Sequence, residues 1–299
     1  MTHKLALIGA GAMGGAIGTR LVETGTVLTA FDLDSEKLGA LVARGAIAAS
    51  SAAEAARGAV AVILSLNSPR IVEAAVFGAG GVAEGAAPGM LIIDMSSIEP
   101  AATQDFARRA GALGIGWVDS PLSGGIPKVA TGDLTLMQGG AEADVAKAQE
   151  LLAGVASNQT HMGPAGAGQT TKLINQVLCG LGFLAVAEAT ALAEAAGVDA
   201  TRIPQALRGG RADSALLQEY MPRFSARDYR RTGRIDNMVK DLNGALDVAR
   251  LGNTSLPLTA ICAEIHRMLT AAGLGGEDQA AVMEYFSGAG RKFPAQGDT

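Results

Sequence analysis

The sequence has few of the residues that build disulfide frameworks, metal centres or nucleic-acid surfaces. Its 299 residues include two cysteines, Cys179 and Cys262, each in an apolar segment, which predicts buried thiols in a reducing compartment rather than a disulfide scaffold. The three histidines are far apart and form no pair at the spacing of a metal site. Lys and Arg total 24 against 29 acidic residues, with no long basic block. We therefore expect neither a metal nor a nucleic-acid partner.

Long hydrophobic runs are also missing. The longest apolar stretch, from Val177 to Ala187, covers 11 residues, whereas a membrane-spanning helix needs about 20. Residues 5–19 could imitate a signal peptide, but their five glycines suit a turn better than an inserting helix. We expect a cytoplasmic protein without a membrane segment.

What remains is the composition of a folded, globular protein. Hydrophobic residues make up 48% and charged residues 18%, with 40 glycines and a net charge of -5. This length corresponds to two domains or one large one.

The first half of the chain alternates short apolar runs with helical patterns. The apolar runs are residues 4–8, 27–31, 46–48, 60–66, 91–94 and 117–119. Helical patterns begin near residue 13 and cover residues 35–44, 51–57 and 103–112. Continuous apolar strands between helices indicate a parallel sheet covered on both faces. The sequence therefore predicts a doubly wound α/β fold of the Rossmann type.

The second half is predicted to be entirely helical. Helical periodicity covers residues 170–196, 201–208, 213–221, 236–251, 256–272 and 279–286. A glycine-rich segment, residues 163–168, marks the boundary, so we expect domains at residues 1–164 and 165–299. The first helix, about 27 residues long, is expected to bridge the domains or to pack on a partner subunit.

Residues 9–14 read GAGAMG, between the first predicted strand and helix. They match the dinucleotide-binding pattern G-x-G-x-x-G, and Asp32 follows about 20 residues on, as that pattern requires. Gly9 permits the tight turn, Gly11 lets a pyrophosphate approach the backbone, and Gly14 allows close packing of helix and strand. The alternative is a glycine-rich turn that binds nothing.

Asp32 bears on the choice of cofactor. A carboxylate at the end of the second strand accepts hydrogen bonds from the ribose hydroxyls of NAD and repels the 2'-phosphate of NADP, so NAD is favoured. NADP stays possible because Lys37 can pair with that phosphate if Asp32 turns aside. Alternatively, Asp32 is only the cap of the helix that starts near Ser35.

Four further motifs follow along the chain: DMSS at residues 94–97, DSPLSGG at 119–125, GPAGAGQTTK at 163–172 with Asn175, and KDL at 240–242. Together with the glycine-rich turn, they resemble the β-hydroxyacid dehydrogenases, the family of 3-hydroxyisobutyrate dehydrogenase and tartronate semialdehyde reductase. The resemblance covers almost the whole chain. It implies an N-terminal dinucleotide-binding domain, a helical domain for substrate binding and oligomerisation, and NAD(P)-dependent interconversion of a small 3-hydroxy acid with its semialdehyde or 3-oxo acid.

The resemblance also assigns residues to the site. Lys172 and Asn175 match the catalytic pair, and Ser123, Gly124 and Gly125 match the loop that binds the substrate carboxylate. The positions implied for the cofactor are Gly9, Gly11, Ala12, Met13, Gly14, Asp32, Leu66, Asn67, Ser97 and Lys240.

Chemistry explains why a lysine belongs in such a site. When hydride leaves the carbinol carbon, the hydroxyl proton needs an acceptor, and the reverse reaction needs a donor. A lysine serves as either, although its ordinary pKa of about 10.4 must be lowered before it acts as a base at neutral pH. Asn175, one helical turn further on, would orient Lys172 or bind a substrate oxygen.

The chain departs from the family at two of these positions. Ser97 stands where many members have threonine, and Gln176 replaces a second asparagine. Asp241, next to Lys240, is a candidate for positioning that lysine. Arg211 is a candidate for recognising a second carboxylate or a polar tail of the substrate.

Two other functions are considered. Imine reductases share the architecture but usually replace the lysine, and a non-catalytic dinucleotide-binding module should lose it and gain a basic or targeting segment. Residue by residue, the simpler interpretations are a surface Lys172, a plain turn at Ser123 and an exposed ion pair at Lys240. We expect an enzyme with its site in the interdomain cleft, working as a homodimer or homotetramer.

Overall fold

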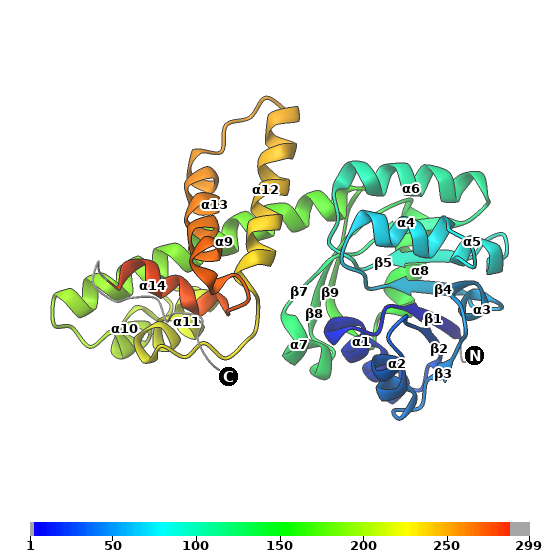
Figure 1. The fold of residues 1–299 in the computed structure, drawn as a ribbon, viewed down its shortest axis with the longest axis horizontal. Helices are drawn as coiled ribbons and strands as arrows, with labels where there is room; N and C mark the ends of the chain where they lie inside the picture. The colour runs from blue at the N-terminus through cyan, green and yellow to red at the C-terminus, as the bar shows by residue number, and fades with distance from the viewer. Residues whose placement is uncertain (1–2, 288–299) are drawn as a thin grey trace. The chain divides into compact units, whose positions relative to one another are not determined.

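A computed structural model describes residues 3–287 of the chain. The chain divides into two compact units, one ending at Lys172 and one beginning at Leu173. Helix α9 (Ala167–Ala195) contributes residues to both units. Figure 1 shows that the first unit holds the strands and that the second is helical.

The first unit is built on one mostly parallel sheet. Its strands are β1 (Lys4–Ile8), β2 (Val27–Phe31), β3 (Ile47–Ala48), β4 (Ala61–Leu64), β5 (Leu91–Asp94), β6 (Gly116–Asp119), β7 (Leu122–Ser123), β8 (Leu134–Gly139) and β9 (Ala156–Gly163). Their order is β3-β2-β1-β4-β5-β6-β8-β7, with β9 paired to β8. Strands β1 to β6 are parallel, while β8 runs antiparallel to β6 and β7. The order reverses at β1, as it does in Rossmann folds at their ligand crevice.

Helices cover both faces of this sheet because successive strand residues point to opposite sides. Leu5 and Leu7 of β1 pack into one cluster with residues of α1 (Ala12–Glu23), α2 (Ser35–Val42), α7 (Gly125–Thr131) and α8 (Glu142–Leu151). Ala6 and Ile8 pack on the other face with α3 (Ala52–Ala56), α4 (Pro69–Phe77), α5 (Val82–Gly85) and α6 (Pro100–Ala112). The predicted fold class is confirmed.

The second unit packs its helices around one apolar core. After α9 come η1 (Ala200–Arg202), α10 (Ile203–Leu207), α11 (Ala215–Ala226), α12 (Ile235–Leu251), α13 (Pro257–Leu269), η2 (Thr270–Leu274), η3 (Gln279–Val282) and α14 (Met283–Phe286). Phe183, Phe224, Leu242 and Cys262 meet in the core. Cys262 is buried as predicted, whereas Cys179 is only half-buried.

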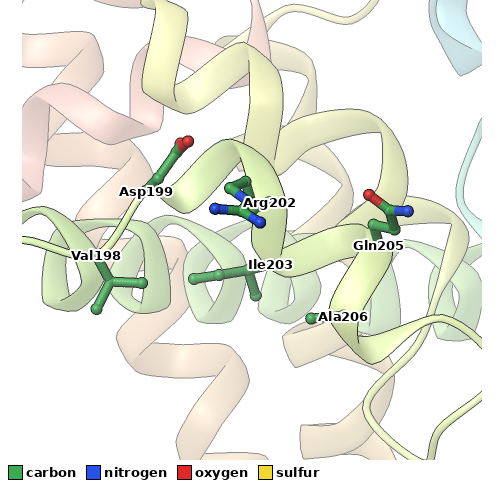
Figure 2. A pocket seen from close by; sticks show the side chains of 6 residues that line it. All are labelled: Val198, Asp199, Arg202, Ile203, Gln205 and Ala206. Carbon is green, nitrogen blue, oxygen red and sulfur yellow. The ribbon is translucent and has the colours of Figure 1, made fainter.

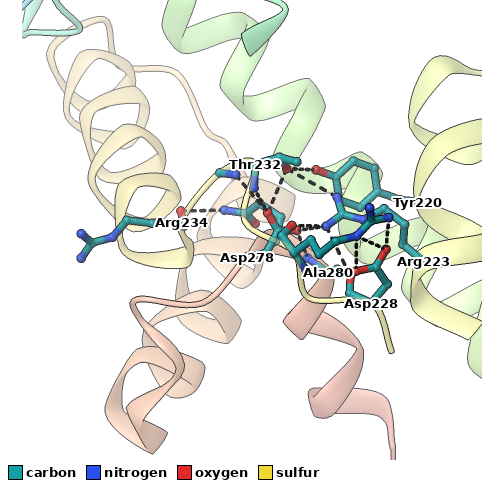
Figure 3. A network of polar contacts seen from close by, with 10 residues as sticks. Tyr220, Arg223, Asp228, Thr232, Arg234, Asp278 and Ala280 are labelled. Carbon is teal, nitrogen blue, oxygen red and sulfur yellow. Dashed lines mark hydrogen bonds and ion pairs between the residues drawn. The ribbon is translucent and has the colours of Figure 1, made fainter. Parts of the chain in front are cut away.

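A buried ion pair fixes the chain between α11 and α12. Asp278, with a fully buried side chain, lies 2.9 Å from Nη2 of Arg223. Its carboxylate also accepts hydrogen bonds from Thr232, Gly233 and the backbone N-H of Ala280 (Figure 3). One carboxylate therefore ties α11, the segment before α12 and the start of η3 together.

Helix α9 is long and apolar enough, by length and composition alone, to cross a membrane. Its residues nevertheless build protein cores: Phe183, Leu184 and Ala187 pack among the helices of the second unit, and its first turn is bonded to the sheet of the first. These parts of the helix therefore belong to the cores of the fold.

Some elements were absent from the sequence-based prediction, notably β8, β9, α4, α7 and α8. Strand β9 reads ASNQTHMG and is largely exposed, so it carries no apolar run. It forms because its backbone pairs with β8. Pairing of this kind depends on a partner strand and leaves no periodic signal in the sequence.

Candidate active site

The residues predicted to bind the cofactor in the first unit gather at one edge of the sheet. Gly9 follows β1, Asp32 follows β2, Leu66 and Asn67 follow β4, and Ser97 follows β5. Because these strands are parallel, their carboxyl ends meet at the same edge. The fold therefore brings together segments that are up to about 90 residues apart in the sequence.

Two glycines of the turn are required by close backbone approaches. Gly9 has φ +96°, and a Cβ there would lie 2.4 Å from the carbonyl oxygen of Ser65. A Cβ on Gly14 would lie 2.0 Å from the carbonyl oxygen of Gly9. No larger residue fits at either position without moving the turn.

Gly11 is different, since nothing lies within 4 Å of the place where its Cβ would be. It is the N-cap of α1, and no side chain caps this helix end. The first N-H groups of α1, in Ala12, Met13 and Gly14, therefore have no intrahelical acceptor, and a helix start of this kind attracts phosphate. Open space beside these donors suits the pyrophosphate of NAD(P).

Asp32 accepts hydrogen bonds from backbone N-H groups, one of them at the start of the glycine-rich turn. Its Oδ2 accepts a hydrogen bond from the N-H of Ala10 at 2.6 Å, and its Oδ1 accepts one from the N-H of Asp34 at 2.8 Å. The half-buried carboxylate thus lies directly beside the glycine-rich turn.

The alternative that Asp32 caps the following helix is wrong. Asp34 is the N-cap of α2 and accepts from the N-H groups of Glu36 and Lys37. Lys37 forms an ion pair with Asp34 at 2.7 Å, which raises the pKa of Lys37 and lowers that of Asp34. Lys37, the positive charge that could pair with a 2'-phosphate, is therefore already paired with Asp34.

The loops after β4 and β5 are bonded to each other. The N-H of Leu66 donates to Oγ of Ser96 at 3.0 Å, and the N-H of Ser96 donates to Asp94. Asp94 is the last residue of β5 and is fully buried. These bonds set the spacing of the two loops that carry Asn67 and Ser97.

The start of α9 is bonded to the same edge of the sheet. Asp119, the last residue of β6, accepts from the N-H groups of Gly166 and Gln169 at 2.8 Å each. A Cβ on Gly168 would lie 2.4 Å from the carbonyl oxygen of Met137, so only glycine allows this close approach of helix and sheet. Lys172, half-buried, comes one turn after Gln169 on the anchored end of α9.

The segment predicted to bind the substrate carboxylate follows β6. Ser123 ends β7, and Gly124 and Gly125 lead into α7 with φ of +121° and +69°. Both glycines occupy backbone conformations that side-chain-bearing residues rarely adopt. A plain turn explains this geometry as well as an anion site does, so its role stays a prediction.

The remaining predicted residues belong to the second unit. Asn175 donates to Oε1 of Gln176, and Gln176 donates to Oδ2 of Asp241 at 2.6 Å. Asp241 also pairs with Lys240 at 3.3 Å. Gln176, where the family more often has asparagine, therefore links α9 to the helix that carries Lys240. The catalytic role of Asn175 and the cofactor role of Lys240 stay predictions, as does a role for the exposed Arg211.

Asp94 and Asp119 form a pair of buried carboxyl groups on neighbouring strands, in register with each other. Burial raises the pKa of Asp94 from 3.8 to about 7, and the charge of Asp119 adds to this. Burial likewise raises the pKa of Asp119 to about 6, although the N-H groups of Gly166 and Gln169 oppose the shift. Sequence reasoning missed both carboxyl groups, although each lies inside a motif that it singled out.

These shifts predict how Asp94 affects stability against pH. Between pH 3.8 and about 7 the folded chain retains a proton that the unfolded chain has released. The free energy of unfolding therefore falls as pH rises through this window. Asp94→Asn should gain stability relative to the unsubstituted chain from pH 5 to pH 8, on the order of 1 to 3 kcal/mol, measured by denaturant unfolding.

Asp133 provides the control for this prediction. Lys128 and Ser157 lower the pKa of this exposed carboxyl, so its titration lies below pH 3.8. The stability difference caused by Asp133→Asn should be constant from pH 5 to pH 8. A difference for Asp94→Asn that is equally constant would contradict the assigned burial effect.

One open hollow of about 630 Å³ lies in the second unit (Figure 2). Its lining consists of Val198, Asp199, Arg202, Ile203, Gln205 and Ala206. None of these is a predicted site residue, and the carboxylate of Asp199 already accepts two hydrogen bonds from Thr201. The hollow therefore adds nothing to the chemistry of the site.

Comparisons with known proteins agree with this geometry. Residues 4–163 match the family described as the NAD binding domain of 6-phosphogluconate dehydrogenase. Residues 166–286 match the family described as NAD-binding of NADP-dependent 3-hydroxyisobutyrate dehydrogenase.

Individual relatives span nearly the whole chain. An L-threonate dehydrogenase of Cupriavidus necator is 33% identical over 96% of this chain and 97% of its own length. A 2-hydroxy-3-oxopropionate reductase of Escherichia coli is 34% identical over 94% of this chain and 96% of its own length. The crystal structure of a 3-hydroxyisobutyrate dehydrogenase from Salmonella typhimurium superposes with a TM-score of 0.84 at 31% identity, covering 95% of this chain and 99% of that one.

The fold and the glycine-rich edge define a dinucleotide-dependent oxidoreductase. The chain belongs to the β-hydroxyacid dehydrogenase family, as its motifs indicated. It is an NAD(P)-dependent oxidoreductase of small 3-hydroxy acids, and the imine reductase and non-catalytic alternatives are set aside.

Proposed function

We propose that this enzyme interconverts a small 3-hydroxy acid and its semialdehyde or 3-oxo acid, with Lys172 as the proton-transferring group. The observation that carries the proposal is the anchoring of α9: Asp119 and Gln169 hold the helix end that bears Lys172 at the carboxyl edge of the sheet. That edge is where Rossmann folds bind dinucleotides.

When bound, NAD(P) accepts a hydride from the carbinol carbon or returns it. The residues of the chain handle the proton and the orientation. In oxidation, a neutral Lys172 amine takes the proton from the substrate hydroxyl, and in reduction its ammonium donates the proton to the carbonyl oxygen. Ser123 and the backbone N-H groups of Gly124 and Gly125 would hold the substrate carboxylate. We also propose that Asn175 orients Lys172 or binds a substrate oxygen, and that Lys240 binds the cofactor.

The proposed organisation assigns dinucleotide binding to residues 1–164, and substrate binding and oligomerisation to residues 165–299. Apolar side chains exposed along α9 support an oligomer: Ile174, Leu178 and Leu192 are each more than half exposed. A homodimer or homotetramer in the cytoplasm is proposed, and sedimentation velocity measures its size.

The substrate is tested directly with purified protein. L-threonate, D-glycerate, 3-hydroxyisobutyrate and L-serine are each supplied with NAD or NADP, and the absorbance of the reduced cofactor is followed. We expect one acid to exceed the others in kcat/KM, and the reverse reaction to run with its oxidised product, a semialdehyde or a 3-oxo acid. Failure of every acid in this class in both directions would overturn the proposed function.

Asp32 should determine the preference for NAD. Asp32→Asn removes the charge that opposes a 2'-phosphate, while the amide oxygen still accepts one of the two backbone hydrogen bonds. The ratio of kcat/KM with NAD to that with NADP should fall by about 10- to 100-fold.

Asp34→Asn is the comparison variant for Asp32→Asn. It changes the neighbouring carboxylate, which caps α2 and pairs with Lys37. Because it also frees Lys37, we expect a modest loss of stability and a smaller fall in the cofactor ratio than Asp32→Asn causes. If Asp34→Asn shifts the ratio and Asp32→Asn does not, the discriminating charge is Asp34.

A further inference from the structure

We infer that Gln169 is a positioning residue that holds Ser97 and Lys172 in fixed relation. The inference rests on the proposed function, because it concerns how the cofactor loop and the proton-transferring helix are aligned. Gln169 would act through these two residues without touching the substrate.

The side-chain amide of Gln169 is bonded on both sides of Ser97. Its Nε2 donates to the carbonyl oxygen of Ser96 at 2.8 Å, and its Oε1 accepts from the N-H of Ile98 at 3.3 Å. The amide thus pairs with the loop as a neighbouring strand would, with one donor and one acceptor. The backbone of Ser97 is held between these two bonds.

Gln169 is also held through its backbone in α9. Its own N-H donates to Oδ2 of Asp119 at 2.8 Å, and its side chain is 1% exposed. Lys172 follows one turn later on α9. A displacement of the Ser97 loop is therefore passed to the helix end that carries Lys172, because the joining contacts are buried and directional.

The choice of side chain supports a positioning role. An aliphatic residue of the same size would fill the space but leave the Ser96 carbonyl and the Ile98 N-H without their partner. A glutamate would accept from Ile98 but, when ionised, could not donate to Ser96. Ser96 is in turn bonded to Leu66 and Asp94, so the chain of contacts extends to the loop after β4.

Gln169→Met tests the inference, since methionine keeps the length and removes both bonds. In the cofactor-free protein, hydrogen exchange of the amides of residues 96–98 should accelerate at least tenfold. With cofactor and acid, kcat should fall about 10- to 100-fold with a smaller change in KM, because misplaced reacting groups lower the rate more than binding. A substrate deuterated at the carbinol carbon should show a larger isotope effect, as hydride transfer becomes slower.

Gln149→Met is the matched control. Gln149 also donates its amide to a backbone carbonyl in the first unit, that of Gln159 at 3.4 Å, and this contact lies on β9, away from the loops after β4 and β5. This variant should keep the kcat, the isotope effect and the exchange rate of residues 96–98 unchanged.

Gln169→Glu keeps the inference testable if the methionine variant folds poorly. A protonated glutamate regains the donor to Ser96, so the kcat of this variant relative to the parent enzyme should rise as pH falls. Asp119 and Asp94, the carboxyl groups bonded to Gln169 and Ser96, favour that protonation, and Lys172 one turn further on opposes it. The corresponding ratio for Gln169→Met should not change with pH.

Unchanged kcat per folded enzyme and unchanged exchange at residues 96–98 in Gln169→Met would overturn the inference. Loss of thermal stability alone, with normal kcat and isotope effect, would also overturn it, because that result describes a purely structural glutamine. Its failure is distinguishable from failure of the proposed function. If the inference fails, the parent enzyme turns over a 3-hydroxy acid and the Gln169 variants match it in kcat and exchange rate. If the proposed function fails, no 3-hydroxy acid is a substrate of the parent enzyme.

Discussion

Lys172→Ala should lower kcat by about 10³-fold, corresponding to about 4 kcal/mol of transition-state stabilisation, and leave cofactor affinity within about threefold. The variant removes the group proposed to exchange a proton with the reacting oxygen. The glycine-rich turn around Gly9 and Gly14, which is proposed to bind the cofactor phosphates, is untouched. The measurements are steady-state turnover and titration of NADH fluorescence.

Lys172→Arg sharpens this test. A guanidinium keeps the positive charge but releases its proton far less readily than an amine does. It should therefore remain as slow as the alanine variant in oxidation. Recovery of turnover with arginine would show that the charge, rather than proton transfer, is what the reaction needs. Equal turnover in Lys172→Ala and the parent enzyme would remove Lys172 from the mechanism.

Asp278→Ala should destabilise the second unit by about 3 to 5 kcal/mol, because it leaves Arg223, whose side chain is only 11% exposed, without its counter-charge. The N-H groups of Thr232, Gly233 and Ala280 also lose their acceptor. Far-UV circular dichroism during urea unfolding follows the helices of both units, so an earlier transition that tryptophan fluorescence does not report belongs to the second unit. The fluorescence of Trp117, the single tryptophan, follows the sheet of the first unit.

Asp247→Ala is the control for Asp278→Ala. Asp247 pairs with Arg250 on α12, where both side chains are exposed. Exposed pairs contribute little to stability, so the unfolding midpoint should hardly change. If the two variants lose the same stability, burial is not what gives the Asp278 pair its importance.

Local sequence patterns predicted much of this protein. The first strand and helix, the glycines between them and Asp32 follow from apolar runs and turn-forming residues that lie within about 30 residues of one another. The fold class followed from the same alternation. The family followed from short motifs whose residues were recognised without knowing what they contact.

Local patterns could not predict contacts between segments that are distant in the sequence. Gln169 lies inside a motif that the sequence analysis singled out, yet its partners Ser96 and Ile98 are more than 70 residues away. Nothing in the local sequence shows that an amide there faces a loop rather than solvent. The cap of α2 is a smaller case, since Asp32 and Asp34 are equally plausible caps until the backbone is placed.

The order of residues along the chain determined which local elements form, because strand, turn and helix preferences act between near neighbours. The sequence also determined the family, because the five motifs are recognised directly in the order of the amino acids. Only the tertiary structure decided which buried polar groups bond to one another: Asp119 with the start of α9, Gln169 with the loop around Ser97, and Asp278 with Arg223. The physical reason is that a buried hydrogen bond needs a partner at about 3 Å, and long-range packing sets that distance.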